Sequence, residues 1–333
     1  MKKPTIKDVA RLSNTFVRTV SRVLNEHPNV KESTRKRVKN IIEELDFKTN
    51  FLAKGLKERK TNQIVIFVDQ RSGDYWGAYH NEVFHEIHRI TKQSEYRLVL
   101  SPSSPDSFHS NENDGFHLVK HNLCDDAIIF DPVKDDQRIM YLKTNKIPFL
   151  LIGDSEHDFE VPYVGIDNVQ VGYSETQALY TEGYRSIALL LGNTKSIINM
   201  KRATGYRNFC KEHGLKETVY HHVYSLESAY KTTTDILRTK LIDAIFISGD
   251  ERALAVYQAI KEFGLTIGKD IGVLDIDNIK MNKYFYPPLS TISQPKYEIA
   301  RAAVDLLIRQ MNSNKNSIHH PELKPTLVKR ASY

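Results

Sequence analysis

The chain has 333 residues, of which 40% are hydrophobic, so it can bury a large core and is long enough for two or three domains. No stretch approaches the roughly 18 uninterrupted apolar residues of a membrane span, and the first twenty residues lack the apolar run of a signal peptide. Only Cys124 and Cys210 are present, far apart in the sequence, which fits a reducing cytoplasm. Secretion and membrane insertion are therefore disfavoured.

The formal net charge of +6 is unevenly distributed along the chain. Residues 1–60 carry 16 Lys and Arg against 7 Asp and Glu, whereas the remainder carries 31 against 34. A solvated protein surface usually mixes its charges, so a basic excess confined to one small segment predicts contacts with phosphate groups.

Residues 5–25, TIKDVARLSNTFVRTVSRVLN, predict two short helices joined by a tight turn. The apolar residues at helical spacing, which would form one small core, are Val9, Leu12, Val20, Val23 and Leu24. Asn14 lies where the chain must reverse, and Asn tolerates the left-handed backbone that such a turn requires. The second helix is left with hydroxyl and basic side chains near its outer face, which are Val17, Arg18, Thr19, Ser21 and Arg22. This pattern favours a DNA-reading element over an ordinary amphipathic helix pair.

A third helix is predicted to begin at Ser33, which would be its N-cap, and to end before Phe47. Its apolar stripe consists of Val38, Ile41, Ile42 and Leu45. We therefore expect a helix-turn-helix domain at 1–47, a polar hinge or linker helix at 48–61, and a core at 62–333.

Apolar runs alternate with helix-length polar stretches from Gln63 onward. The first series covers 64–68, 96–100, 127–130 and 148–153, and the second covers 186–192, 244–248 and 271–277. These runs are too apolar for half-exposed strands, so they predict two parallel sheets, each covered by helices on both faces.

A series of motifs runs through the chain in a fixed order. They are DVA (8–10), TVSRVLN (19–25), TRKRV (34–38), IDN (166–168), RATGYRNF (202–209), LTIGKDIGVLDIDN (265–278), PPLSTISQP (287–295) and LVKRAS (327–332). With these motifs the chain resembles the lactose/galactose repressor (LacI/GalR) family of bacterial transcription regulators over essentially its whole length.

The resemblance implies an all-α three-helix helix-turn-helix DNA-binding head and an α/β periplasmic-binding-protein-like core of two lobes with parallel sheets. It implies a cytoplasmic, nucleoid-associated homodimer that is not an enzyme and needs no cofactor. Its partners would be palindromic double-stranded operator DNA and a small-molecule effector between the lobes. The expected function is repression of a sugar-utilisation operon, modulated by a sugar.

Matching the family's motif places base contacts on Val17, Arg18 and Arg22, since Arg can bond guanine and Val can touch a thymine methyl. The expected phosphate contacts are Thr5, Thr19, Ser21, Asn25 and Thr34. The hinge pattern, which the resemblance associates with minor-groove insertion, is Asn50, Ala53 and Leu56. Several positions depart from the family: Asn14 replaces Gly, Phe16 replaces Ser, Thr49 replaces Pro, and Gly55 replaces a larger residue.

The resemblance also implies an effector site with an Arg, carboxylates and aromatic rings, the groups that grip and stack on sugars. Its expected members are Tyr75, Trp76, Arg202, Tyr224, Asp250 and Asp277. Gly249 and Gly153 stand where Asn and Asp are frequent in the family, and Asp154 is expected to compensate for the second loss.

Other functions are less well supported by the sequence. His80, His85 and His88, or His319 and His320, lack further ligands at metal-binding spacing, so no metal is expected. No hydrolase motif or phosphate-binding glycine loop is present. A global carbon regulator with a phosphoprotein co-regulator and a nucleobase-responsive repressor remain alternatives. A sugar-binding transport receptor is the alternative from a different class, and the basic head argues against it.

Overall fold

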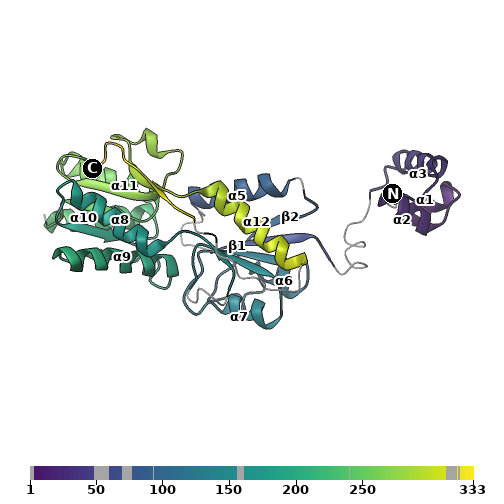
Figure 1. The fold of residues 1–333 in the computed structure, drawn as a ribbon, viewed down its shortest axis with the longest axis horizontal. Coiled ribbons are helices and arrows are strands. Elements are labelled where there is room, and N and C mark those ends of the chain that lie inside the picture. Colours follow the sequence, from purple (N-terminus) through teal and green to yellow (C-terminus); the bar gives the residue numbers. More distant parts are fainter. Residues whose placement is uncertain are drawn as a thin grey trace. The chain divides into compact units, whose positions relative to one another are not determined.

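The computed structural model describes residues 4–48, 60–69, 77–92, 94–155, 161–239, 241–312, 321 and 323–333. The chain divides into two compact units, Met1–Thr61 and Asn62–Tyr333, which we call the head and the core. The head contains α1 (Ile6–Leu12), α2 (Val17–Leu24) and α3 (Glu32–Glu44) (Figure 1). No helix of the described residues is long and apolar enough to cross a membrane.

The three helices of the head enclose a small apolar core. Its buried members are Val9, Ala10, Val20, Val23 and Val38, with Leu24, Ile41, Ile42, Leu45 and Phe47 packed around them. Asn14 has a φ of 48°, so the predicted left-handed residue does make the turn between α1 and α2.

Two local predictions for the head are wrong. Leu12 is 46% exposed because it is the last residue of a short helix, and Ser13 is buried instead, its hydroxyl donating to the Val9 carbonyl at 2.7 Å. The third helix begins at Glu32 with Lys31 as its N-cap, so Ser33 lies inside the first turn rather than capping it.

The first lobe of the core contains a five-stranded parallel sheet in the order β2-β1-β3-β4-β5. Its strands are β1 (Gln63–Val68), β2 (Arg97–Pro102), β3 (Asp126–Phe130), β4 (Phe149–Ile152) and β5 (Tyr163–Val164). Its helices are α5 (Ala78–Thr91), α6 (His117–Lys120), α7 (Gln137–Thr144) and α12 (Lys296–Asn312). Ile64, Ile66 and Val68 pack with α5 and α12, whereas Val65 and Phe67 pack on the other face with Phe108, Phe116 and Leu142. Both faces are covered, as predicted.

The second lobe contains a six-stranded sheet in the order β11-β10-β9-β8-β6-β7. Its strands are β6 (Ile187–Leu190), β7 (Val219–Tyr220), β8 (Ala244–Ile247), β9 (Gly272–Asp277), β10 (Ser290–Ser293) and β11 (Thr326–Val328). Its helices are α8 (Asn168–Thr181), α9 (Ile197–His213), α10 (Leu226–Thr239), α11 (Asp250–Glu262) and the 3₁₀ turn η1 (Asn282–Tyr284). β11 pairs antiparallel with β10, so this sheet is not parallel throughout as expected.

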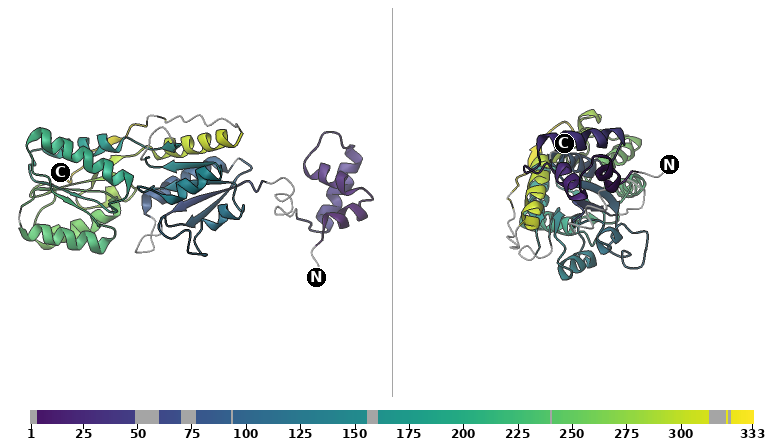
Figure 2. Two further views of the ribbon diagram at one scale, coloured as in Figure 1. Left: turned by 90° about the horizontal axis from the view of Figure 1, so that it is seen from below. Right: turned by 90° about the vertical axis from the view of Figure 1, so that its right-hand side faces the viewer.

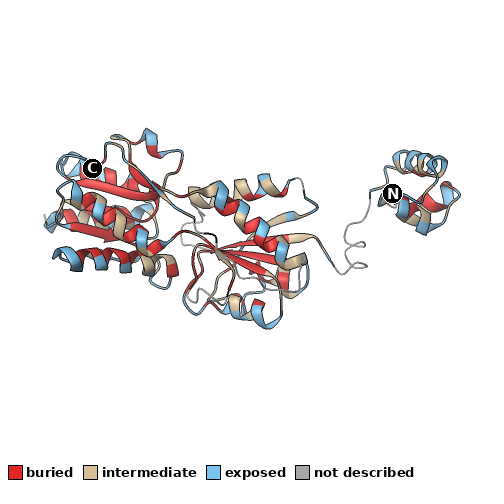
Figure 3. Cartoon of the chain, in the orientation of Figure 1, coloured by how far each residue is buried: buried red, intermediate tan, exposed pale blue. Residues whose placement is uncertain are grey.

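The chain passes between the lobes more than once. It enters the second lobe between β5 and α8, returns after β10 as α12 of the first lobe, and ends in the second lobe with β11 (Figure 2). In both lobes the central strands are buried, the edge strands β2, β7 and β11 are partly exposed, and the helices expose their outer faces (Figure 3).

Candidate functional site

A cavity of about 240 Å³ is lined by residues from both lobes. Several lining residues directly follow the carboxyl ends of strands: Asp69 after β1, Asp131 after β3, and Ser248 after β8. The edge at the carboxyl ends of the strands is where open α/β sheets bind their ligands. The cavity therefore occupies the position that the fold favours for a small-molecule site.

Arg202 is the buried cation in the lining of this cavity and is only 6% exposed. Its Nε donates to Asn168 Oδ1 at 3.0 Å, and its Nη1 donates to Ser248 Oγ at 2.6 Å. Because these bonds come from the start of α8 and the end of β8, the guanidinium group is held in place before any ligand arrives.

Two glycines let α8 approach the helix that carries Arg202. A Cβ on Gly172 would lie 2.0 Å from the Arg202 carbonyl oxygen, and one on Gly205 would lie 1.9 Å from the Val169 carbonyl oxygen. Any side chain at either position would push α8 and α9 apart and move the guanidinium group away from Asn168.

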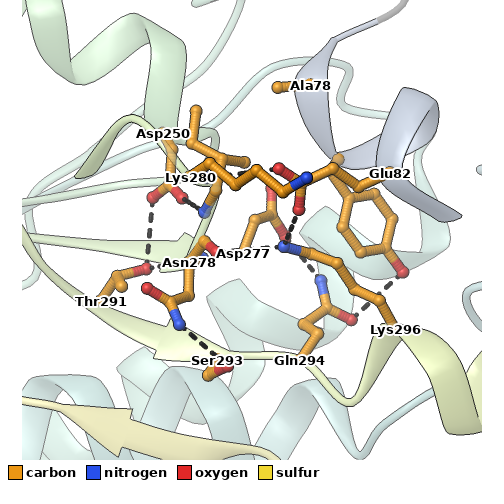
Figure 4. A network of polar contacts seen from close by, with 12 residues as sticks. Ala78, Glu82, Asp250, Asp277, Asn278, Lys280, Thr291, Ser293, Gln294 and Lys296 are labelled. Carbon is orange, nitrogen blue, oxygen red and sulfur yellow. Dashed lines mark hydrogen bonds and ion pairs between the residues drawn. The ribbon is translucent and has the colours of Figure 1, made fainter. Parts of the chain in front are cut away.

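Asp277, which the sequence predicts as an effector contact, lies at the end of β9 and also lines the cavity. Its Oδ1 accepts a hydrogen bond from Gln294 Nε2 at 2.6 Å, and Gln294 Oε1 accepts one from the Tyr79 hydroxyl at 3.3 Å (Figure 4). This chain of bonds links α5 of the first lobe to β9 of the second. Burial raises the pKa of Asp277, while Arg202 and Gln294 oppose the shift.

Asp154 and Asp250 were expected to contact the effector, but the structure places neither in the lining of the cavity. Asp154 is 2% exposed, bonds Lys201 Nζ at 2.6 Å and accepts from Asn168 Nδ2 at 3.1 Å. Asp250 is fully buried and accepts from the Ile279 backbone N–H at 2.8 Å. Asp154 thus orients Asn168, which in turn holds Arg202, and Asp250 fixes the loop after β9.

The aromatic part of the predicted site is only partly described. Tyr224 lines the cavity, is 38% exposed, and has its hydroxyl 2.8 Å from His222 Nδ1. Tyr75 and Trp76 lie outside the described residues.

Several residues that line the cavity were not predicted as site residues from the sequence. His80 Nε2 lies 2.7 Å from Asp131 Oδ2, and both side chains line the cavity. The further polar lining residues not singled out from the sequence are Asp69, Tyr79, Asn168, Asn193, Ser196, Asn199, Ser248, Arg252 and Gln294. Asp69 and Asp131 could have been predicted from their position, because each directly follows an apolar run and therefore lies at the carboxyl end of a predicted strand.

A second group of contacts joins the lobes beside the cavity. Glu82 of α5 accepts a hydrogen bond from the Lys280 backbone N–H of the second lobe at 3.2 Å, and it also pairs with Lys296 Nζ of α12, within the first lobe, at 2.7 Å (Figure 4). Glu251 of α11 accepts a hydrogen bond from the Ala78 backbone N–H at the start of α5. A rotation of one lobe against the other would have to change these contacts.

In the head, Val17, Arg18 and Arg22 of α2 are exposed, whereas Val20 and Val23 are buried in the core. The predicted base-contacting side chains therefore lie on the surface of the helix that the head leaves open to solvent.

The predicted phosphate contacts have mixed positions. Asn25 and Thr5 are exposed, while Thr19, Ser21 and Thr34 are partly exposed. The Thr5 hydroxyl donates to Asp8 Oδ2 at 2.7 Å, and the Thr5 N–H donates to the same oxygen at 2.9 Å, so Thr5 also caps α1. Asn50, Ala53 and Leu56 lie outside the described residues.

Among the described residues, no group of three or more His, Cys, Asp or Glu side chains is arranged to hold a metal ion. The cavity instead combines one buried guanidinium group with carboxylates, amides and hydroxyls. These groups donate and accept hydrogen bonds, so they can bind a polar small molecule.

A basic helix-turn-helix head and a two-lobed α/β core with a polar cavity together define a DNA-binding regulator that also binds a small molecule. Residues 5–50 match the family model of bacterial regulatory proteins of the lacI family, and residues 176–333 match the periplasmic binding protein-like domain.

Catabolite control protein A of Priestia megaterium is 30% identical over 316 residues, covering 92% of each chain. The ribose operon repressor of Haemophilus influenzae is 27% identical over 335 residues, covering 98% of each. The crystal structure of the Lac repressor dimer bound to operator and the anti-inducer ONPF superposes with a TM-score of 0.85 at 24% identity, covering 99% of each chain, which shows the shared fold. The chain belongs to the lacI family of bacterial regulatory proteins, DNA-binding transcription regulators that are not enzymes. The family and fold class predicted from the sequence are confirmed.

Proposed function

We propose that this protein represses a sugar-utilisation operon from the cytoplasm, as a nucleoid-associated homodimer, and that a sugar bound at Arg202 sets its affinity for operator DNA. The carrying observation is the cavity itself, where the Arg202 guanidinium group is held by Asn168 and Ser248 and faces the same space as Asp277.

The chemistry of the cavity favours a small polyhydroxylated ligand. Hydroxyl groups both donate and accept hydrogen bonds, and the lining offers donors on Arg202 and acceptors on Asp277. Apolar side chains of Val133, Ile152 and Ile166 supply surface for the C–H face of a sugar ring. The volume lies below the roughly 300–1,000 Å³ of pockets for drug-sized ligands, which fits a small molecule. The similarity to the ribose operon repressor supports the same ligand class.

The head would bind the operator through α2. In this proposal Val17, Arg18 and Arg22 contact bases, and Thr5, Thr19, Ser21, Asn25 and Thr34 contact the phosphate backbone. The exposure of the first three supports it. The hinge residues Asn50, Ala53 and Leu56 would bind the minor groove, and we retain the division into 1–47, 48–61 and 62–333.

A homodimer would match a palindromic operator, since each subunit presents one head to one half-site. Exposed apolar side chains of the second lobe support self-association. They include Tyr284 and Tyr286, which are 75% and 94% exposed, and also Leu254 and Met281. The underlying loop is anchored on α11, where the Tyr257 and Phe285 rings lie 5.0 Å apart. Apolar surfaces of this kind commonly become buried in subunit interfaces.

In the proposed mechanism the ligand selects one arrangement of the two lobes. The contacts of Glu82 with Lys280 and of Glu251 with Ala78 between the lobes would differ between the two arrangements, and the dimer would convert that difference into a different spacing of the hinge segments. By linkage, a sugar that weakens operator binding must itself be bound more weakly by the operator complex.

Titrating the full-length protein with a sugar panel tests the proposal. We expect at least one sugar to change the fluorescence of Trp76, the only tryptophan of the chain, and to change operator affinity at the same concentration. The Arg202→Ala variant should show neither response. If no sugar binds and a purine changes operator affinity, the ligand is a nucleobase and the sugar proposal is wrong.

A second candidate is global carbon regulation with a phosphoprotein co-regulator, which the similarity to catabolite control protein A favours. Affinity capture from a lysate of cells grown on a preferred sugar distinguishes the two. Operator binding that requires a captured phosphoprotein and ignores free sugars supports this second candidate.

A further inference from the structure

Phe16 is the most exposed large apolar side chain of the described head, at 82% exposure. It occupies the N-cap of α2 with an extended backbone, φ −85° and ψ 150°, so its ring leaves the helix instead of packing beneath it. By contrast, Phe47, the other described phenylalanine of the head, packs against the apolar core.

This position breaks two local rules at once. A helix N-cap favours Ser, Thr, Asp or Asn, because a side-chain oxygen can accept a hydrogen bond from the first turn. Phe16 offers no acceptor, and α2 begins without a side-chain capping bond. The residue also leaves a large ring in water, which a small polar side chain would avoid. Violations that gain nothing within the fold are typical of functional positions.

The surroundings of Phe16 identify the chemistry of its partner. Arg18 and Arg22 lie on the exposed side of α2, opposite Val20 and Val23, and the first turn carries no acidic residue. With the basic excess of residues 1–60, this surface attracts a polyanion. In duplex DNA the apolar group of the major groove is the 5-methyl of thymine.

We infer that Phe16 packs its ring against a thymine methyl group in the major groove and thereby specifies an A·T pair in each half-site. In helix-turn-helix proteins the N-terminal residues of the recognition helix contact base edges, and Phe16 immediately precedes that helix. The inference rests on the proposed operator binding by α2. It assigns a base contact to Phe16, which stands where Ser is usual in the family.

Deoxyuridine substitution tests this contact, because it removes only the methyl group of thymine. The operator is first selected from a random duplex library with the full-length protein, and each thymine is then replaced singly. Burying one methyl group contributes about fourfold in affinity. We expect the wild type to lose about fourfold at one symmetry-related pair of thymines, and Phe16→Ala to bind thymine and uracil equally there.

Two further variants separate contact from stability. Phe16→Ser restores a capping hydroxyl, so it should raise the melting temperature of the head while losing the methyl response. Leu12→Ala, which removes another exposed apolar side chain of the head, should keep the full response.

The inference would be overturned if, at every thymine, replacement by uracil changed the affinity of Phe16→Ala as much as that of the wild type. A loss of dimer in Phe16→Ala by sedimentation would also overturn it, since the ring would then contact a second copy. If selection yields no sequence bound better than random DNA, the proposed function itself has failed.

Discussion

The guanidinium groups of Arg18 and Arg22 in the head are exposed and form no hydrogen bond or ion pair with a described residue. The guanidinium group of Arg202 in the core is 6% exposed and bonded to Asn168 and Ser248. The proposed partner of the head is DNA, whose phosphate groups carry the opposite charge, so the cations of the head can stay solvated until DNA binds. The cavity meets a small polar ligand, so its groups are ordered during folding and depend on one another.

The largest effect should come from breaking the ordered site. Arg202→Ala leaves Asn168 and Ser248 without their partner and removes the cation that faces Asp277, so we expect the free energy of unfolding to fall by about 3 kcal/mol. Affinity for the effector should fall at least tenfold. Urea unfolding and ligand titration measure the two losses.

A matched control lies on the same helix. Arg207 forms an exposed ion pair with Glu217 at 3.5 Å, so Arg207→Ala should cost less than about 1 kcal/mol of stability. Equal destabilisation by the two substitutions would contradict the distinction between an ordered cavity cation and a solvated one.

The head should behave in the opposite way. Arg22→Ala should cost about 1–3 kcal/mol of operator binding and relax the choice at one base pair, yet change the free energy of unfolding by no more than about 0.5 kcal/mol, because its guanidinium group bonds no described residue. Lys39→Ala, an exposed cation on α3, should weaken specific and random DNA alike. Fluorescence anisotropy titrations with operator and scrambled duplexes measure both affinities. An equal loss of affinity for the two duplexes in Arg22→Ala would show that Arg22 does not contact bases.

A smaller effect should reveal the buried, protonated carboxyl group of Glu175 in the core. Glu175 is fully buried, neither carboxylate oxygen has a hydrogen-bond partner in the described structure, and burial raises its pKa well above the ordinary value. The native state therefore holds a proton that the unfolded state releases, so stability falls as pH rises from the ordinary glutamate pKa through the raised one.

Glu175→Gln abolishes this titration while keeping the shape of the side chain. We expect its urea midpoint to exceed that of the wild type, by a margin that widens from pH 5 to pH 8. Glu298→Gln, at an exposed position on α12, should show no such trend. A margin that shrinks with rising pH would mean that Glu175 is charged in the folded protein.

The smallest effect concerns the head core. Leu12→Ala should cost less than about 1 kcal/mol because the side chain is 46% exposed, whereas Val20→Ala should cost about 2 kcal/mol because Val20 is fully buried. If thermal unfolding showed that Leu12→Ala and Val20→Ala lose similar stability, Leu12 would belong to the core, as the sequence predicts.

The strands β1, β3, β4, β6, β8 and β9 could be predicted because each contains a largely apolar run that is buried. The edge strand β2 could be predicted from its apolar residues, although it is partly exposed. β5, β7 and β11 escaped prediction because they contain two or three residues each, and β10 because Ser290–Ser293 mixes polar and apolar residues. Their pairing depends on neighbours that are distant in sequence, such as Thr291 of β10 opposite Val328 of β11.

The residues of the site likewise include some that could be predicted from the sequence and some that could not. Arg202 and Asp277 could be located because they stand in motifs matched along the chain, and Tyr224 because the resemblance implies an aromatic residue there; all three line the cavity. The His80–Asp131 pair could not, because 51 residues separate its members and only the α5 and β3 packing brings them together. Asp154 and Asp250 have the residue type of ligand contacts, but their burial among protein donors could be seen only in three dimensions.

The central claim is that a ligand at Arg202 controls binding of DNA by the head, and the most direct measurement is operator affinity of the full-length protein with and without a sugar. For at least one member of a panel containing ribose and galactosides, the account predicts a change of fivefold or more in wild-type operator affinity. Arg202→Ala should bind the operator with normal affinity and ignore that sugar. An equal response of Arg202→Ala to the sugar would contradict control through this cavity, and so would unchanged operator affinity with a sugar that demonstrably binds at Arg202.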